Sequence, residues 1–375
     1  MISFWEKNSF LNYDVIIIGG GLNGLSIASS IKEKYPRKSV LIIEKGSWPV
    51  GASTRNAGFA CYGSFSELRA DTQNFGLDNT LKLVELRYKG MEMHLRRLGK
   101  KNCGYEQSGG GELIFDKENF ENEELVQFNQ WLHPIFREEV FKENSSKIES
   151  FGFNKKGLKT FIDNSTEGQV NIGLMMKNLW HYTAELGVMI MNGLEVIDYS
   201  DNGSSCSVYA HHNVIKEQPV FKCETLILAT NAFSQKFLPS MDIVPGRGQV
   251  LATEPIKGLK LKGNVHFNAG MFYFRNFENR IIFGGGRHLF KEEETTMEMD
   301  LNLKIHNTLD SYLQNLIIPG IPYKVEYRWA GIMAFGQDKM PIIEEISPNV
   351  IAGVKMGGMG LALSGITGQH IADML

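Results

Sequence analysis

Cysteine is scarce in this chain, and its spacing excludes the common cysteine sites. Four cysteines occur among 375 residues, and no two of them are spaced like zinc ligands or a redox pair. We therefore expect no metal site, and a reducing cytoplasm is the simplest setting for the protein. The four are Cys61, Cys103, Cys206 and Cys223.

Long hydrophobic runs and an excess of one charge are also missing. The longest apolar stretch, 15–31, is interrupted by glycines and polar residues and is too short to span a bilayer. The opening segment MISFWEKNSF lacks the regions of a signal peptide, so none is expected. The net charge of −3, with both signs dispersed, favours neither nucleic acid nor an acidic membrane surface as a partner.

The chain is long enough for two domains, because 375 residues exceed the size at which one core usually stops growing. Four continuous apolar runs indicate buried strands of a parallel sheet, which we expect helices to cover on both sides. Amphipathic helices are predicted from Ile172, with Asn171 as N-cap and Gly187 as the stop, and over about 81–98. The apolar runs are DVIIIG (14–19), SVLIIE (39–44), TLILAT (225–230) and NVIAGV (349–354).

Two regions have a different texture. Residues 117–150 are charged and predicted to be helical, whereas 246–330 contain alternating or aromatic strands that predict an antiparallel sheet. These strands are GMFYFR, NRIIFGGGR and KVEYRWAGI. We predict an α/β fold in which a nucleotide-binding domain is interrupted by a smaller antiparallel domain.

The glycine pattern of DVIIIGGGLNGLSIASSI carries the strongest functional signal. Gly19, Gly21 and Gly24 follow a strand and open a helix, the arrangement that brings backbone close to a pyrophosphate. Glu44 ends the next strand 20 residues after Gly24, where a carboxylate accepts hydrogen bonds from ribose hydroxyls. The alternative is a glycine-rich turn with a surface glutamate. The predicted dinucleotide site also includes Leu22, Asn23 and Lys45.

Several segments together resemble the D-amino-acid oxidase superfamily of FAD enzymes, which includes glycine oxidase, sarcosine oxidase and γ-glutamylputrescine oxidase. The matching segments are DVIIIGGGLNGLSIA, IIEKG, GASTRNAGFA, TLILATNAFS, VPGRGQV, NRIIFGGGR, WAGIMAFGQDKMPII and GGMGLALS, in the family's order. The resemblance implies a Rossmann-type FAD-binding domain with an interleaved antiparallel-sheet substrate domain. The expected FAD-binding ranges are 1–103, 150–240 and 332–375, and the substrate ranges are 104–149 and 241–331.

The resemblance also implies further residues around FAD. The loop GASTRNAGFA would follow the pyrophosphate and pass beneath the flavin, and the glycines before the last helix would direct backbone N–H groups at the flavin ring. The alternatives are a surface loop and a simple helix cap. The implied residues are Ser53, Thr54, Arg55, Asn56, Ala57, Gly58, Val196, Ala229, Thr230, Asn231, Met333, Gly357, Gly358, Met359, Gly360 and Leu361.

Members of this superfamily oxidise a C–N bond, or less often a C–O bond, by hydride transfer to flavin, after which the imine hydrolyses. This chain departs from relatives at Met333, where glycine oxidases place a carboxylate-binding arginine, and it has no flavin-linking cysteine beside Ile332. Ala362 replaces the lysine of sarcosine oxidases. Noncovalent FAD is therefore expected, and a small α-amino acid is disfavoured as substrate.

Candidate substrate-pocket residues are Tyr273, Arg275 and Arg328, and Arg287 and Arg247 are further candidates for a carboxylate partner. A solvated arginine or a structural ion pair is the alternative for each. We expect an FAD-dependent amine or amino-acid oxidase or dehydrogenase that uses O2 or another electron acceptor. A flavin-dependent 2-hydroxy-acid dehydrogenase and an FAD-binding protein without turnover remain open at this point.

Overall fold

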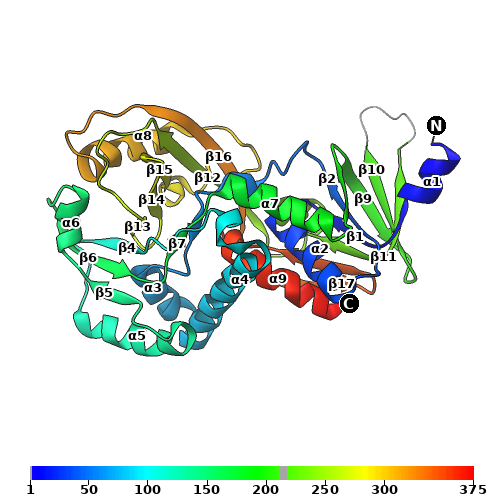
Figure 1. Cartoon of the computed structure of the whole chain (residues 1–375), viewed down its shortest axis with the longest axis horizontal. Helices are drawn as coiled ribbons and strands as arrows, with labels where there is room; N and C mark the ends of the chain where they lie inside the picture. Colours follow the sequence, from blue (N-terminus) through cyan, green and yellow to red (C-terminus); the bar gives the residue numbers. More distant parts are fainter. Residues whose placement is uncertain (1, 212–217) are drawn as a thin grey trace.

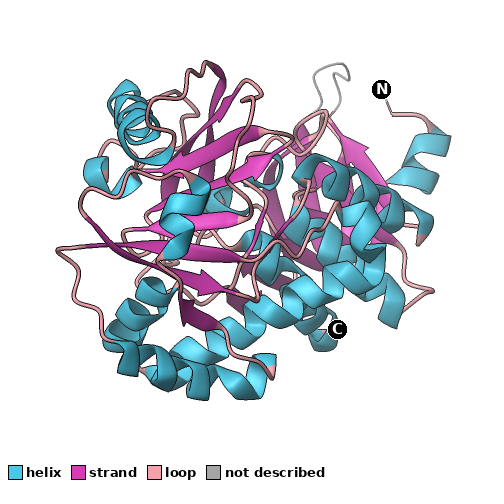
Figure 2. Cartoon of the chain, turned by 60° about the vertical axis from the view of Figure 1, so that its left-hand side comes forward, coloured by secondary structure: helices cyan, strands magenta, loops and turns pink. Residues whose placement is uncertain are grey.

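The computed structural model describes residues 2–211 and 218–375. Two eight-stranded sheets lie in separate halves of the molecule, and the colours of Figure 1 show that the chain passes between the halves several times. Helices flank both sheets in Figure 2, whereas edge strands such as those at 195–201 and 342–347 carry exposed residues. In the described part of the chain, no helix has the length and apolar character needed to cross a membrane.

The first sheet has a parallel centre. Its path is β17-β18-β11-β1-β2-β8, where neighbouring strands are parallel except at the β17–β18 edge, and β10 and β9 continue antiparallel from β11. All four predicted apolar runs lie in this parallel core. The strands are β1 (Asn12–Ile18), β2 (Val40–Glu44), β8 (Met189–Asn192), β9 (Glu195–Asp201), β10 (Cys206–His211), β11 (Val220–Leu228), β17 (Ile342–Ser347) and β18 (Val350–Val354).

Alternate residues of β1 enter two different cores, which explains its continuous apolar run. Val15 and Ile17 pack with helices, whereas Ile16 and Ile18 pack with residues of β9, β10 and β16. The prediction of helices on both faces was therefore wrong, because strands cover the second face. Helices α2 (Leu22–Lys34), α4 (Leu77–Cys103), α7 (Ile172–Glu185) and α9 (Gly360–Met374) gather on the first face.

The predicted helices are confirmed. Asn171 caps α7, where its Oδ1 accepts a hydrogen bond from the N–H of Leu174 at 3.0 Å. The region 117–150 contains two helices but also a short strand. The remaining helical elements are α1 (Phe4–Phe10), η1 (Ala52–Thr54), α3 (Phe65–Phe75), α5 (Asn122–Phe136), α6 (Ser146–Phe151), η2 (Asn231–Lys236), η3 (Arg287–Phe290), α8 (Leu303–Tyr312) and η4 (Leu313–Ile317).

The second sheet has the order β16-β12-β15-β14-β13-β4-β6-β5 and is antiparallel except between β13 and β4. The predicted antiparallel pairing of the aromatic strands is confirmed. Phe267, Phe272, Phe274 and Phe283 pack under α8 on one face. The strands are β4 (Gly110–Phe115), β5 (Phe141–Glu143), β6 (Leu158–Asn164), β12 (Val244–Thr253), β13 (Asn264–Phe267), β14 (Phe272–Phe277), β15 (Arg280–Gly285) and β16 (Val325–Phe335), and β3 (Phe59–Ala60) pairs separately with β7 (Gly168–Gln169).

Sheet membership differs from the predicted ranges in two places. β6 pairs with β4 and β5 of the second sheet, although 150–240 was grouped with the cofactor domain. β16 is one continuous strand across the expected boundary at 332. Apolar residues of β6 such as Phe161 enter the aromatic core, which places this strand in the second sheet. The functional division into two domains stays a prediction.

Candidate active site

The glycine turn between β1 and α2 is too tight for a side chain at two positions. Gly19 has φ +106, and a Cβ atom there would lie 2.8 Å from the carbonyl oxygen of Ala229. A Cβ atom at Gly24 would overlap the carbonyl oxygen of Gly19. α2 therefore begins directly against the end of β1, and the first N–H groups of this helix have no acceptor within the helix itself.

Glu44 lies beside this turn at the end of β2. Its side chain is only 7% exposed. Its Oε2 accepts a hydrogen bond from the N–H of Gly20 at 2.9 Å, and its Oε1 accepts one from the N–H of Gly46 at 2.9 Å. Because a carboxylate has about four acceptor positions, both oxygens retain capacity for further hydroxyl donors.

Ser53 connects the loop 51–58 to the glycine turn. Its Oγ accepts a hydrogen bond from the N–H of Leu22, the first residue of α2, at 2.9 Å. The same Oγ lies 2.6 Å from the position of a Cβ atom at Gly21. The serine oxygen thus occupies the electropositive N-terminus of α2, where an anion would be stabilised.

Thr54 and Asn56 form hydrogen bonds with backbone groups of the same segment and thereby stabilise the conformation of the loop. Thr54 Oγ1 donates to the carbonyl of Pro49 at 2.7 Å, and Asn56 Nδ2 donates to the carbonyl of Ser53 at 2.9 Å. Gly58 has φ +75, and a Cβ atom there would lie 2.8 Å from Arg275 Nη2. The carbonyl oxygen of Val170 lies even closer to this Cβ position, at 2.6 Å, so Gly58 accommodates both a backbone carbonyl and an arginine of the second sheet.

Arg55 fastens the loop to β16. Its Nε donates to the carbonyl of Val50 at 3.0 Å, and its Nη1 donates to the carbonyl of Ala330 at 2.8 Å. In return, Trp329 Nε1 donates to the carbonyl of Arg55 at 2.8 Å. The bonds to Ala330 and from Trp329 tie the loop to β16, the strand that carries Met333, whereas the bond to Val50 is local.

The end of β11 also approaches the glycine turn. Ala229 donates its N–H to the carbonyl of Ile18 at 2.9 Å. Thr230 Oγ1 lies 2.7 Å from Ser234 Oγ, which closes the next turn. Asn231 has φ +49, and its Oδ1 accepts a hydrogen bond from the N–H of Met356 at 3.2 Å, so this segment is joined to the end of β18.

A second glycine turn follows β18 and leads into α9. Gly357 and Gly358 have φ +55 and +80, and the N–H of Gly357 donates to the carbonyl of Ala334 at 3.0 Å. The Sδ atom of Met333 lies 3.3 Å from the Cβ position of Gly358. Met333 therefore contacts the turn that the sequence singled out. Met359, Gly360 and Leu361 continue this turn into α9.

The second sheet presents polar side chains on the face opposite its aromatic core. Tyr273 and Arg275 alternate with the core residues of β14, and His266 faces the same way from β13. The ring of Phe59, which directly follows the loop 51–58, lies 5.3 Å from the His266 ring and 5.5 Å from the Tyr273 ring. We call this surface the polar face: Asn264 and His266 of β13, Tyr273 and Arg275 of β14, and Glu112 of β4.

Arg275 is buried, and none of the described carboxylates is hydrogen-bonded to it. Its side chain is 2% exposed, and it donates to Gln169 Oε1 at 3.2 Å and to the carbonyl of Val170 at 3.0 Å. Burial lowers its pKa to about 10. Burial also raises the pKa of Tyr273 to about 12, so both groups keep their protons at neutral pH.

Arg328 is engaged away from the polar face. Its Nη2 donates to both carboxylate oxygens of Asp310, at 2.9 and 2.8 Å, and its Nη1 lies 3.0 Å from His306 Nδ1. Arg328 pairs across β16 and β12 with Leu251, a member of the aromatic core. The ion pair joins β16 to α8. The observed contacts of Arg328 are therefore those of a structural ion pair, the alternative to a substrate contact.

Sequence reasoning missed a buried carboxylate cluster at the polar face. Glu167 is fully buried and its Oε2 lies 3.1 Å from His266 Nε2, while Asn264 Nδ2 donates to the same oxygen at 3.2 Å. Burial raises the pKa of Glu112 to about 7, and its Oε2 accepts a hydrogen bond from the N–H of Ser66. The alternation in NVHF could have indicated the outward side of β13, but nothing local links it to Glu112 or Glu167.

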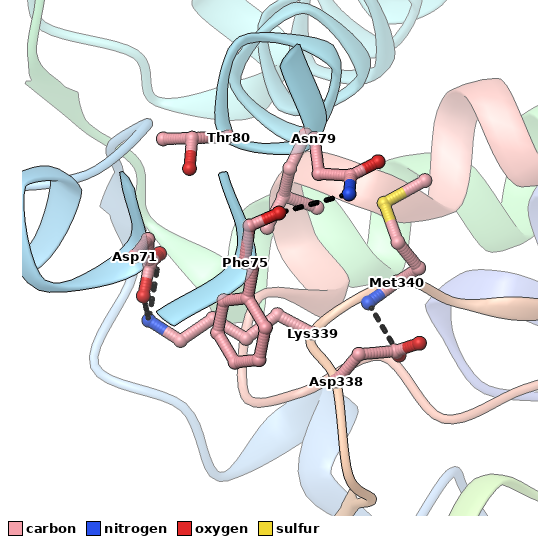
Figure 3. Close-up of a pocket in the computed structure, with 8 residues that line it drawn as sticks. Asp71, Phe75, Asn79, Thr80, Asp338, Lys339 and Met340 are labelled. Atoms are coloured by element: carbon pink, nitrogen blue, oxygen red, sulfur yellow. Dashed lines mark hydrogen bonds and ion pairs between the residues drawn. The ribbon is translucent and has the colours of Figure 1, made fainter. Parts of the chain in front are cut away.

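A separate pocket of about 150 Å³ lies between α3, α4 and the segment after β16. Figure 3 shows Lys339 reaching Asp71 beside this pocket, and the Nζ to Oδ1 distance is 2.7 Å. Lys339 also pairs with Glu67 at 2.9 Å. The ammonium group of Lys339 is thus paired with two carboxylates of α3, and these ion pairs connect α3 to the segment 336–341. The pocket is lined by Asp71, Phe75, Asn79, Thr80, Leu83, Asp338, Lys339 and Met340.

Comparison of the sequence with models of known protein families identifies the cofactor of the family. The family model described as FAD dependent oxidoreductase matches residues 14–374. The chain belongs to this family of FAD-dependent oxidoreductases.

Two curated relatives of this FAD-dependent oxidoreductase are bacterial. It is 23% identical to the probable oxidoreductase OrdL of Haemophilus influenzae, over 96% of this chain and 82% of that protein. It is also 23% identical to the gamma-glutamylputrescine oxidoreductase of Escherichia coli, over 99% of this chain and 85% of that protein.

Solved structures share its fold. The L-proline dehydrogenase of P. horikoshii has a TM-score of 0.76 at 18% identity and covers 97% of this chain and 93% of its own. The glycine oxidase of Bacillus cereus has a TM-score of 0.74 at 21% identity and covers 96% of this chain and 94% of its own.

The residues of this oxidoreductase fit FAD at the first glycine turn. The added Cβ atoms at Gly19 and Gly24 collide with backbone, so only glycine permits this approach. Glu44 keeps acceptor capacity beside the turn, and its contact with ribose hydroxyls stays a prediction. Ser53 Oγ at the N-terminus of α2 shows that this end accepts an oxygen ligand, as a pyrophosphate requires.

Three other predicted cofactor residues have protein partners in this structure. Asn23 Nδ2 donates to the carbonyl of Gly353 at 2.6 Å, which ties α2 to β18. Lys45 Nζ lies 4.0 Å from the centre of the Phe233 ring, and the carbonyl of Val196 accepts a hydrogen bond from Lys236 at 3.4 Å. Direct contacts of these residues with FAD stay predictions.

Proposed function

We propose that this chain oxidises the C–N bond of an amine or amino acid, with noncovalent FAD as the hydride acceptor and O2 or another molecule as the final electron acceptor. The reaction would take place in the cytoplasm. The named relatives and structural neighbours include oxidoreductases of gamma-glutamylputrescine, L-proline and glycine, which supports this substrate class. FAD supplies the redox chemistry, and the protein supplies position and a dry pocket.

One observation carries the proposal. The loop 51–58 contacts the glycine turn through Ser53 and is followed at once by Phe59, which contacts the polar face. The loop 51–58 and the glycine turn would hold the cofactor, and His266 and Tyr273 are the polar residues that contact the ring directly after this loop. In this arrangement Phe59 and Met333 would add apolar groups to the lining of the site, and Tyr273, which keeps its proton, would offer a hydroxyl for positioning a substrate.

The cysteines support noncovalent attachment and a reducing compartment. All four are free and buried. Burial raises the pKa of Cys61 well above its usual value, which leaves its thiol protonated and poorly reactive. A flavin link through sulfur would require an accessible thiolate.

Product analysis tests the proposed reaction. The purified FAD-loaded enzyme would be incubated with amines, amino acids and 2-hydroxy acids together with an artificial electron acceptor. We expect one equivalent of ammonia, or of a smaller amine, for each two electrons transferred. A carbonyl product formed from a hydroxy acid without release of nitrogen would contradict the proposal.

A further inference from the structure

The arginines near the second sheet differ in how many of their N–H groups already donate hydrogen bonds to other protein groups. Arg247 donates from Nε and Nη2 to both oxygens of Glu294, at 2.9 and 2.8 Å. Arg328 donates from Nη2 alone to both oxygens of Asp310, and its Nη1 faces His306 Nδ1. Arg275 is buried and donates to neutral oxygens of Gln169 and Val170. These three arginines serve structural contacts.

Arg287 is different. It lies in η3, directly after β15, and its side chain is half-buried. The guanidinium carbon is 4.1 Å from the centre of the Phe335 ring. Within the described part of the chain, the guanidinium makes no hydrogen bond and no ion pair. A guanidinium stacked on a ring keeps its N–H edge free for an anion, and that edge matches a carboxylate with two parallel hydrogen bonds.

Arg287 and Met333 lie on the same side of the β12–β16 pair. Gly246 of β12 is paired with Met333 of β16, and the Nη1 atom of Arg287 lies 3.4 Å from the Cβ position of Gly246. Phe335, on which Arg287 stacks, follows Met333 by two residues and points to the same side of β16. Gly248, two residues along β12, accommodates the Met333 side chain, whose Cε is 2.7 Å from its Cβ position.

Met333 cannot bind a carboxylate, because its thioether has no N–H or O–H donor, so another residue near it would have to perform that function. We propose that Arg287 supplies it from the neighbouring element, by binding a carboxylate of the substrate beside the Met333 side chain. The substrate class is then an amine that also carries a carboxylate. This inference rests on the proposed function, since it assigns a specificity residue to the same site.

A binding experiment tests the inference independently of turnover. Benzoate and its neutral isostere benzamide would be titrated into the FAD-loaded enzyme while the visible flavin spectrum is recorded. We expect saturable perturbation by benzoate in the wild type. Arg287→Met should weaken benzoate binding by roughly 10- to 100-fold, the range expected when one charge-assisted contact is lost. Benzamide binding should change less than threefold.

Matched variants separate a local effect from a loss of folding. Arg287→Lys retains the charge but not the two-pronged geometry and should give an intermediate benzoate affinity. Arg96→Met removes an arginine from the exposed side of α4 and should leave benzoate affinity unchanged. Flavin content and thermal unfolding would be measured for all variants.

Two results would overturn the inference: benzoate that fails to saturate the wild type, or equal benzoate affinity in wild type and Arg287→Met. Kinetics distinguish this failure from failure of the proposed function. If amines with and without a carboxylate reduce the flavin equally well, the amine oxidation stands and the role of Arg287 is rejected. If no amine reduces the flavin, the proposed function itself is rejected.

Discussion

At the scale of single residues, Gly24 is the position where one added methyl group should matter most. The Cβ atom of an alanine would overlap the carbonyl oxygen of Gly19, which belongs to the backbone and cannot turn away. Gly24→Ala should therefore destabilise the protein by about 2 kcal/mol, as overpacking does, and lower its FAD content. Urea denaturation and the flavin-to-protein absorbance ratio would measure the two effects.

Gly173→Ala is the matched control for this prediction. Gly173 also lies in the first turn of a helix, but its nearest added contact is an ordinary 3.5 Å to Asn171 Oδ1. Because alanine favours helix more than glycine, this variant should be as stable as the wild type or slightly more so. Equal behaviour of the two variants would contradict the proposed tight turn.

Glu112 should make stability depend on pH. Burial raises its pKa to about 7 from an ordinary 4.5, so the unfolded chain releases this proton at a lower pH than the folded protein. Its contribution to stability is therefore lost as the pH rises from about 4.5 to 7. Glu112→Gln should be more stable relative to the wild type at pH 8 than at pH 5, as measured by urea denaturation.

The exposed Glu143→Gln should show the same difference from wild type at both pH values, which makes it the control for Glu112→Gln. Groups around Glu112 include His266, Glu118 and Ser64. An identical stability difference at pH 5 and pH 8 for Glu112→Gln would show that this carboxyl is not held protonated by burial.

The residues of the glycine turn could be predicted because they are close in sequence. Gly19, Gly24 and Glu44 lie within one strand–helix–strand unit, so spacing alone indicates their meeting. His266 and Glu167 are 99 residues apart and meet only because Glu167 folds back against β13. No local pattern could have brought them together.

At the scale of elements, the connection between the loop 51–58 and β16 links the two sheets. Arg55 was predicted to bind FAD, yet two of its nitrogens donate to the carbonyls of Val50 and Ala330. Arg55→Met should therefore lower the stability of the FAD-free protein by about 1–3 kcal/mol and speed proteolysis of the loop. Urea denaturation and limited digestion of the apoprotein would measure this.

Trp329→Phe gives a comparison for the same connection. It removes only the bond from the indole N–H to the Arg55 carbonyl and keeps a large aromatic ring, so we expect a smaller loss. If Arg55→Met leaves the apoprotein unchanged and weakens only FAD binding, Arg55 is a cofactor ligand as the sequence suggested.

The elements were predictable where their apolar pattern is continuous. Four parallel strands, β1, β2, β11 and β18, were found because they form continuous buried runs. The parallel edge strand β8 was not predicted, because its residues are exposed or half-buried. The packing of β9 and β10 over one face of the sheet was not predicted, because their alternating residues are also typical of a solvent-exposed hairpin. β6 was grouped with the wrong sheet because its pairing with β4 spans a long separation in sequence.

At the scale of the whole molecule, the two sheets meet at the predicted cofactor site, so FAD should hold the halves together. A ligand that binds only the folded state stabilises it, by about 2.7 kcal/mol at a free concentration 100 times its Kd. We expect FAD to raise the Tm of the apoprotein by several degrees. Riboflavin, which lacks the pyrophosphate and adenosine, should raise it far less, and an equal shift would contradict binding at the glycine turn.

The most direct test of the central claim is the visible spectrum of the FAD-loaded enzyme, recorded without oxygen while substrates are added. The series would include D- and L-amino acids, N-methyl amino acids, polyamine derivatives and 2-hydroxy acids. We predict that an amine or amino acid bleaches the flavin band, and readmitted air would then distinguish an oxidase from a dehydrogenase. Bleaching by 2-hydroxy acids alone, or by no compound in the series, would contradict the assignment as an amine oxidoreductase.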